Sequence, residues 1–166
     1  SVQFDIVVVN DNDPISSVSI ELNSIDENSP QGTLVGTISI VDEDAFPTYY
    51  YDFVNKDSTF NGSLKYQVNG DRLEVRTPPD FETSSVDTVY LRIYDGPHYF
   101  IKEIHVDILD VPEIPGDIEL TQMSVDENNE PDQVIAGIVV IDQDATSTYE
   151  YSLIMSDTTE SEFFSI

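Results

Sequence analysis

The sequence repeats one acidic phrase after about 100 residues, and this repeat constrains the fold more than any other feature. Three segments return at this interval: 25–28 (IDEN) as 125–128 (VDEN), 41–45 (VDEDA) as 141–145 (IDQDA), and 48–51 (TYYY) as 148–151 (TYEY). A fixed period defines the folding unit, so one small domain occurs in tandem. Because the carboxylates recur together with the apolar positions, the duplicated property includes a charge cluster as well as a core.

The chain is strongly acidic, with 33 Asp and Glu against 6 Lys and Arg, and a formal net charge of −27 over 166 residues. Nucleic acid is excluded as a natural partner and an anionic membrane surface is disfavoured, because both require clustered basic residues. A hydrophobic content of 39%, with nine Tyr and eight Phe, argues against disorder. Two interpretations of the acidity stay open: surface charge that serves solubility or halophily, and carboxylates that bind a hard divalent cation.

Cysteine is absent, so the chain has neither disulfides nor thiolate metal sites. An extracellular chain of this kind needs another source of stability, and calcium is available outside cells. No stretch approaches the ~20 apolar residues of a membrane span, and no signal peptide is recognisable. We therefore expect an excerpt from a longer extracellular protein, with no membrane insertion in this segment.

The hydrophobic pattern has period two nearly throughout. Residues 34–40, 89–94 and 104–109 alternate apolar and polar side chains, which is typical of a sheet with one buried face. Asn69-Gly70 lies between two such runs and predicts a tight hairpin. About seven short strands between Ser17 and Asp110, with no convincing helix, predict an all-β antiparallel sandwich.

The two ends of the sequence indicate the domain boundaries. Residues 2–8 with the linker after them parallel residues 102–108 with theirs. The sequence therefore predicts four parts: 1–14 as the last strand of a preceding domain plus its linker, 15–110 as a complete domain, 111–116 as a linker, and 117–166 as the first half of a second domain.

Several short motifs follow one another in a fixed order: 26–30 (DENSP), 42–44 (DED), Phe60 with 62–64 (GSL), 80–82 (DFE), 95–96 (DG) and the linker 9–14 (VNDNDP). In this order and spacing they resemble the cadherin repeat, of the kind found in tandem arrays of large, particularly bacterial, surface adhesins. The resemblance implies a seven-stranded Greek-key sandwich, cadherin-like or immunoglobulin-like, with Ca²⁺ bound at domain junctions.

The acidic motifs suit a calcium ion. Residues i and i+2 of a strand point to the same side, so Asp42 and Asp44 can converge on one cation, as can Asp80 and Glu82. Calcium takes six to eight oxygen ligands, more than one motif supplies, so sites should form where several loops meet. A solvated turn is the alternative for an isolated Asp-x-Asp motif, but its return at 142–144 beside acidic linkers favours the cation.

The resemblance also assigns ligands to individual ions. Near residues 110–116, Glu27, Asp80, Glu82 and Glu113 would hold one Ca²⁺, and Glu27, Glu82, Asp110 and Asp144 would hold its neighbour. We expect no well-occupied third ion there, because Pro112 and Ile114 stand where the family has Asn. A separate ion near residues 10–14 would be held by Asn10, Asp11, Asn12, Asp42, Asp44 and Asp95. In the second copy the corresponding candidates are Glu127, Asp142 and Asp144.

We expect a non-catalytic, extracellular, calcium-dependent adhesion or rigid-spacer segment at a cell surface. Its partners would be other cadherin-like domains of the same chain, with another surface protein or a glycan as a further candidate. One alternative is a glycan-binding or accessory module of a secreted polysaccharide-active protein. The chain lacks Trp for such a role, but residues 49–51 (YYY) could stack on sugars unless they occupy a central strand. The other alternative is a filament subunit, in which residues 2–8 of one copy complement the incomplete sandwich of residues 117–166 in the next.

Overall fold

The computed structural model describes residues 3–7, 9, 11–44, 47–61, 65–144, 147–154 and 165–166. It divides into two units, Ser1–Val111 and Pro112–Ile166, which are treated separately below. Every regular element among the described residues is a strand, so this part of the chain has no helix that could span a membrane. The strands of unit 1 are β1 (Ser17–Leu22), β2 (Ile25–Asp26), β3 (Leu34–Val41), β4 (Tyr49–Val54), β5 (Tyr66–Asn69), β6 (Arg72–Val75), β7 (Val86–Asp95) and β8 (His98–Leu109).

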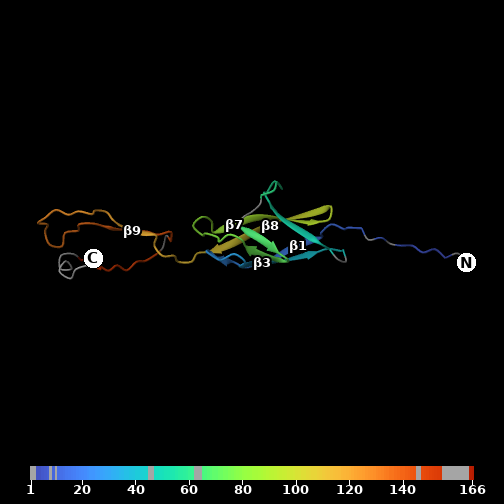
Figure 1. Cartoon of the computed structure of the whole chain (residues 1–166), viewed down its shortest axis with the longest axis horizontal. Helices are drawn as coiled ribbons and strands as arrows, with labels where there is room; N and C mark the ends of the chain where they lie inside the picture. Colours follow the sequence, from blue (N-terminus) through green and yellow to red (C-terminus); the bar gives the residue numbers. More distant parts are fainter. Residues whose placement is uncertain are drawn as a thin grey trace. The chain divides into compact units, whose positions relative to one another are not determined.

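Unit 1 is a sandwich of two sheets, as the alternating pattern predicts (Figure 1). One sheet has the strand order β1-β3-β6-β5 and the other β2-β8-β7-β4. All pairs are antiparallel except β2 with β8, which is parallel. Only two residues separate β1 from β2, yet these strands lie in different sheets, so the first part of the chain contributes to both layers.

The core lies between the sheets and follows the predicted alternation. On β7, Leu91 and Ile93 are fully buried, and on β8 every second residue from Ile104 to Ile108 is buried. The intervening His105 and Asp107 are exposed, as expected for the solvent face. The β7–β8 pairing runs without a break from Val86–Asp107 to Asp95–His98 and forms the longest ladder of the sandwich.

Two details differ from the sequence prediction. The hairpin between β5 and β6 is shifted by one residue, because Asn69 pairs with Arg72 and the two-residue loop is Gly70–Asp71. Gly70 has φ +65°, which a two-residue type II′ turn requires at its first position, so the glycine sets the register. The strand that contains residues 49–51, β4, lies at the edge of its sheet and not in a central position.

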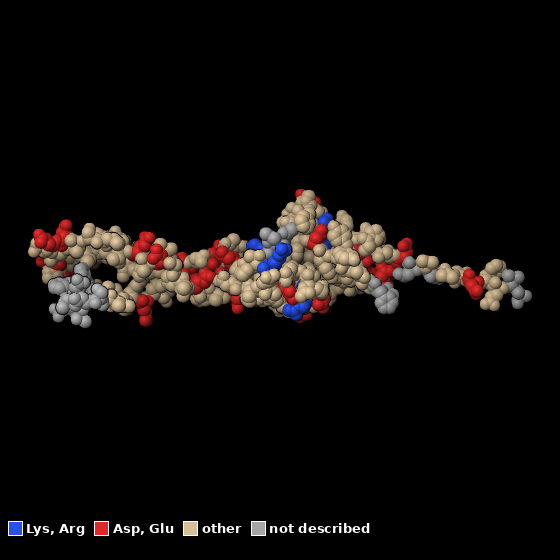
Figure 2. All heavy atoms as spheres, in the orientation of Figure 1, with Lys and Arg blue, Asp and Glu red and all other residues tan. Residues whose placement is uncertain are grey.

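Several charged side chains that are buried or half-buried in unit 1 form hydrogen bonds and ion pairs within the sandwich. The Asp87 carboxylate accepts hydrogen bonds from Lys65 Nζ (2.6 Å) and from the buried Tyr66 hydroxyl (2.9 Å). Burial, and then the Asp87 carboxylate, raise the pKa of Tyr66, so this hydroxyl stays a donor. Arg92 makes a two-point ion pair with Asp52, at 2.9 and 2.6 Å. All six Lys and Arg residues belong to unit 1, and Figure 2 shows acidic side chains exposed on both units.

Unit 2 repeats the start of unit 1. Its strands β9 (Asp117–Leu120) and β10 (Ile138–Ile141) pair antiparallel, and the pair Ile118–Val140 repeats Val18–Ile40 at an offset of 100. Residues 147–154 contain no strand, so the described part of unit 2 has two strands where we expected about four.

The predicted strand over residues 1–9 is not formed in its described part, residues 3–7 and 9, which is exposed and irregular. A strand needs a paired neighbour to be stable. The complementation alternative therefore stays a prediction. Residues 62–64, which carry one motif of the resemblance, lie outside the described residues.

The contrast between the faces of β7 gives a test of the core. Leu91→Ala should lower the free energy of unfolding by about 2–5 kcal/mol, because it leaves a cavity at a fully buried position. Val86→Ala, on the same strand but 45% exposed, should cost less than about 1 kcal/mol. Urea denaturation followed by tyrosine fluorescence measures both. Equal losses of unfolding free energy in the two variants would show that the assignment of inward-facing and outward-facing residues along β7 is wrong.

Candidate metal centres at the ends of the domain

Two groups of carboxylates lie at opposite ends of unit 1, separated by the length of the β7–β8 hairpin. Asp95 ends β7 next to the tight connection to β8, where it pairs with His98. Asp110 follows directly after the far end of β8. Because the pairing of this hairpin is uninterrupted, these two residues mark the two ends of the sandwich. We name the groups the Glu27 group and the Asp95 group.

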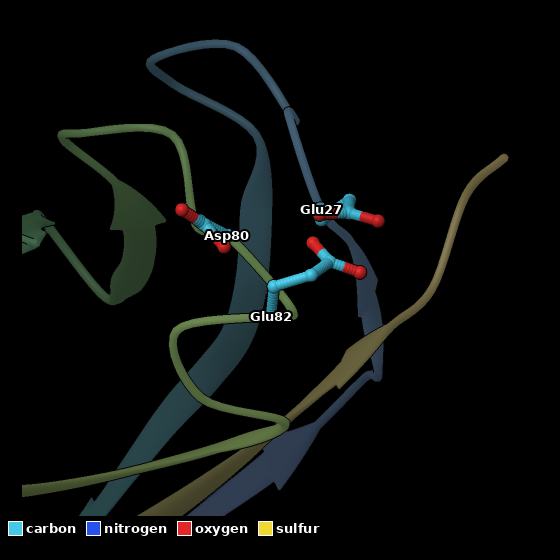
Figure 3. A group of neighbouring side chains, drawn as sticks. All are labelled: Glu27, Asp80 and Glu82. Carbon is cyan, nitrogen blue, oxygen red and sulfur yellow. The ribbon is translucent and has the colours of Figure 1, made fainter. Parts of the chain in front are cut away.

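The Glu27 group consists of Glu27, Asp80 and Glu82, with one carboxylate oxygen of each within 4.8 Å of the others (Figure 3). Glu27 follows β2, whereas Asp80 and Glu82 lie in the loop between β6 and β7. A carboxylate oxygen of Asp110 also lies within 4.8 Å of Glu82. The fold therefore brings Glu27, Asp80 and Glu82 together and places Asp110 beside Glu82.

Glu27 is buried and is held in place by backbone hydrogen bonds. It is only 3% exposed, and its two oxygens accept hydrogen bonds from the backbone N–H groups of Phe81 (3.0 Å) and Val111 (2.9 Å). The Glu27 N–H itself donates to the carbonyl of Leu109. An ionised carboxylate has about four lone-pair sites, so two backbone donors orient it and leave room for a cation.

Asp80 is kept ionised by its own loop. Its Oδ1 accepts from the backbone N–H of Thr83 (2.9 Å) and its Oδ2 from the Thr83 hydroxyl (3.0 Å). These hydrogen bonds, the backbone one first, lower the pKa of Asp80, because they stabilise the charged form.

The Asp95 group consists of Asp42, Asp44 and Asp95, again with ligand oxygens within 4.8 Å of one another. Asp42 and Asp44 follow β3 in one sheet, whereas Asp95 ends β7 in the other, so the group joins the two layers. Asp95 is 2% exposed. The backbone N–H of Asp13 donates to Asp44 Oδ2 at 3.1 Å, which attaches the linker before β1 to this group.

The linker residues are placed unequally. Asn12 reaches the group, and its Nδ2 donates to Asp95 Oδ2 (2.9 Å) and to the Asp95 carbonyl (3.2 Å). Gly96 makes this approach possible: it has φ +53°, and a Cβ there would lie 3.0 Å from the Asn12 side-chain oxygen. Asp11 Oδ1 accepts a local hydrogen bond from the backbone N–H of Asn12 (3.1 Å), and Asn10 lies outside the described residues.

Unit 2 carries a third set, Glu113, Asp142 and Asp144. The backbone N–H of Glu113 donates to Asp144 Oδ2 (2.6 Å), and Gln143 donates to Glu113 Oε2 (3.1 Å). Asp144 is 8% exposed, and its Oδ1 is buried without a hydrogen-bond partner. A buried carboxylate oxygen without a partner is costly, and a bound cation would satisfy it.

Glu127 is exposed and belongs to none of the carboxylate groups found among the described residues. Its counterpart Glu27 is positioned by backbone N–H groups of residues 81 and 111. The equivalent positions, 100 residues further on, fall beyond residue 166. The prediction of Glu127 as a ligand therefore stays untested by this geometry.

Two tyrosines contact these groups although the sequence analysis did not assign them to a site. The Tyr49 hydroxyl donates to Asp42 Oδ2 (3.1 Å), and the Tyr149 hydroxyl donates to Asp142 Oδ2 (2.7 Å). Burial, and then the hydrogen bond to Asp42, raise the pKa of Tyr49. The recurrence of Thr48-Tyr49 as Thr148-Tyr149 was the sequence signal that could have identified these tyrosines. The same recurrence is equally expected for tyrosines that only pack in the core.

The chain is similar to cadherins and protocadherins. Cadherin-24 of Mus musculus is 30% identical over 164 residues, which cover 88% of this chain and 21% of that protein. The solved structure of protocadherin gamma B2 extracellular cadherin domains 1–5 has a TM-score of 0.59 at 22% identity, covering 82% of this chain and 27% of that one. Human protocadherin-24 domains EC1–2 give a TM-score of 0.61 at 17% identity, covering 87% and 70%. No protein-family model matches.

The chain thus spans about a fifth of the length of the curated relatives it matches. The structural likeness confirms the predicted all-β, cadherin-like fold. The sequence likeness confirms an extracellular, adhesion-type domain, and it agrees with the prediction that the segment is not an enzyme.

The hydrogen bonds of Asp80 give a pH-dependent prediction. Thr83→Val removes the hydroxyl donor, so the pKa of Asp80 should rise toward its ordinary value, measurable by carboxyl ¹³C NMR. Because the folded pKa lies below the unfolded one, the stabilisation is complete above the unfolded pKa and is lost as pH falls through the folded pKa. Thr83→Val should therefore be less stable than the unaltered chain at neutral pH and nearly as stable in acid.

Thr37→Val on β3 is the matched control and should leave the Asp80 titration unchanged. The same Asp80 pKa in both variants would mean that the Thr83 hydroxyl does not stabilise the carboxylate.

Proposed function

We propose that this chain, which carries a cadherin-like domain, is a calcium-dependent adhesion or rigid-spacer segment of a larger, repetitive extracellular surface protein. The observation that carries the proposal is the gathering of carboxylates from separate loops at both ends of unit 1. A carboxylate group at each end of a domain suits ions that connect successive domains of a tandem array.

The donor set favours calcium over other metals. Every candidate ligand is an oxygen from Asp, Glu or Asn, and the chain has no cysteine. The two histidines, His98 and His105, are exposed and belong to none of the carboxylate groups of the described residues. Calcium accepts many oxygen ligands in flexible geometry, whereas Mg²⁺ demands a near-ideal octahedron and keeps several waters. Loops of different origin suit the more tolerant ion.

Repulsion within each group gives the cation its effect on stability. Two unit charges 4.8 Å apart repel by about 3 kcal/mol at an effective dielectric constant of about 20. The Asp95 group contains three such pairs, two of which involve Asp95, a carboxylate that is almost fully buried. A divalent ion attracts each carboxylate and so outweighs their mutual repulsion, which means that calcium would hold together strands from both sheets and the linker that precedes β1.

At the linker formed by residues 111–116 we propose two calcium ions in preference to three. Glu27, Asp80, Glu82 and Asp110 supply the oxygens at the end of unit 1. The assignment of Glu113 and Asp144 to the same ions rests on the resemblance to cadherin repeats. The buried Oδ1 of Asp144, which has no hydrogen-bond partner, supports a cation at that residue.

Calcium titration with two matched Asp variants tests the proposal. In the unaltered chain, Ca²⁺ at a hundredfold excess over its Kd should add about 2.7 kcal/mol per site and raise the melting temperature relative to EDTA. Asp44→Asn should weaken calcium binding and reduce this gain, because it removes one charge from the Asp95 group.

Asp107→Asn makes the same change in charge at an exposed position of β8 and should bind calcium like the unaltered chain. Isothermal titration calorimetry and thermal melting provide the measurements. No calcium binding by the unaltered chain, or equal losses in the two variants, would refute the proposal.

A glycan-binding role is a second candidate, and one feature of the outer sheet face favours it. Tyr50, Tyr94 and Tyr99 occupy neighbouring positions across β4, β7 and β8, because Tyr50 pairs with Tyr94 and Tyr94 with Tyr99. Tyr50 is 69% and Tyr99 59% exposed, and Arg92 lies 4.9 Å from the centre of the Tyr94 ring. Exposed aromatic rings on a flat face can stack on sugars.

Glycan-array binding separates this candidate from the first. Under it, the unaltered chain should bind a defined set of glycans, and a Tyr50→Ala, Tyr99→Ala double variant should lose that binding. Tyr151→Ala, in unit 2 and 42% exposed, serves as the control and should retain it. The absence of glycan binding, with calcium binding intact, would leave the adhesion or spacer role.

A further inference from the structure

A tyrosine follows seven residues after the first aspartate of each Asp-x-Asp motif, and in both copies its hydroxyl donates to that aspartate. The distance is 3.1 Å from Tyr49 to Asp42 Oδ2 and 2.7 Å from Tyr149 to Asp142 Oδ2. The other oxygen, Oδ1, accepts from the backbone N–H two residues further on, at 3.1 Å in both copies. Each of these carboxylates therefore accepts at least one hydrogen bond on each oxygen.

Tyr49 is itself firmly anchored. It is the first residue of β4, and its ring packs against the hydrophobic core of unit 1. Its backbone pairs with Asp95, the most buried carboxylate of the group. Asp42 follows β3 in the opposite sheet, so the hydroxyl connects a ligand of one sheet to the strand that flanks a ligand of the other.

We propose that Tyr49 and Tyr149 are positioning residues for the cation: each fixes the first aspartate of its motif so that a free lone pair faces the ion. The inference rests on the proposed function, since it concerns the same carboxylates. An ionised carboxylate has about four lone-pair sites, and two donors leave the remainder for a metal. The tyrosine does not need to touch the ion.

The recurrence in unit 2 is an independent occurrence of the same arrangement. The Tyr149 ring lies 6.3 Å from that of Tyr151, and the described part of unit 2 has only two strands. The contact with Asp142 thus forms without the complete core that supports Tyr49. Because the hydrogen bond from tyrosine to aspartate forms in both units although the packing around the tyrosine differs, we attribute it to orientation of the carboxylate and not to packing of the core.

The expected effect is a change in metal affinity. Groups that orient metal ligands typically change affinity by about 10–100-fold when they are removed. Tyr49→Phe and Tyr149→Phe keep the ring and delete only the donor, so the fold should persist. Each should weaken calcium binding about tenfold at its own site, measured by isothermal titration calorimetry on the full 166-residue chain. Tyr51→Phe is the control, because Tyr51 packs against the same core two residues further along β4.

A second readout separates positioning from a purely structural role. Tb³⁺ bound in place of Ca²⁺ and excited directly has a luminescence lifetime that reports the number of coordinated waters. If a freed carboxylate leaves the ion, about one additional water should replace it in Tyr49→Phe and Tyr149→Phe but not in Tyr51→Phe.

Unchanged calcium affinity and unchanged water number in both variants would overturn the inference, even if the metal-free variants melted at a lower temperature. That outcome, with normal binding by the unaltered chain, would leave the proposed function standing. An unaltered chain that binds neither Ca²⁺ nor Tb³⁺ would overturn the proposed function, and the positioning role with it.

Discussion

Burial of the inner face of the β7–β8 hairpin is the constraint on which the rest of unit 1 depends. Its apolar residues fill the space between the sheets, and its ten paired positions set the length of the sandwich. Once this ladder is fixed, Asp95 and Asp110 must lie at opposite ends, and the loops that end there deliver their acidic side chains to the same two places. The separation of the Glu27 group from the Asp95 group is therefore a consequence of core packing.

The carboxylates of the two groups are oriented by different kinds of hydrogen-bond donor. Glu27 depends on two backbone donors and Asp80 on Thr83, whereas Asp95 accepts from the amide of Asn12. Each of these hydrogen bonds stabilises a negative charge at a position where neighbouring carboxylates repel it. Such orientation makes a site ready for a cation, because the cost of gathering the ligands is met largely by hydrogen bonds and packing.

Much of the architecture could be predicted from local patterns. The alternation along β7 and β8 identifies the buried residues correctly because side-chain direction in a strand has a strict period of two. The predicted position of the β5–β6 hairpin was wrong by one residue. An Asn-Gly sequence can start a two-residue loop at either residue, and only the pairing of Asn69 with Arg72 decides that the loop is Gly70–Asp71. The edge position of β4 was missed, because strand order depends on contacts between distant segments.

The sequence by itself determined the repeat, the all-β class and the chemical type of the candidate ligands, since these follow from residue identity and spacing. It also selected Asp42, Asp44, Asp80 and Glu82 through the i, i+2 rule. Only the tertiary structure decided which motifs share a group, because Glu27 and Asp95 join their partners across 51 or more positions of the chain. The roles of Tyr49, Asn12 and Thr83 were decided there too, since a hydrogen bond depends on where a side chain ends and not on its place in a pattern.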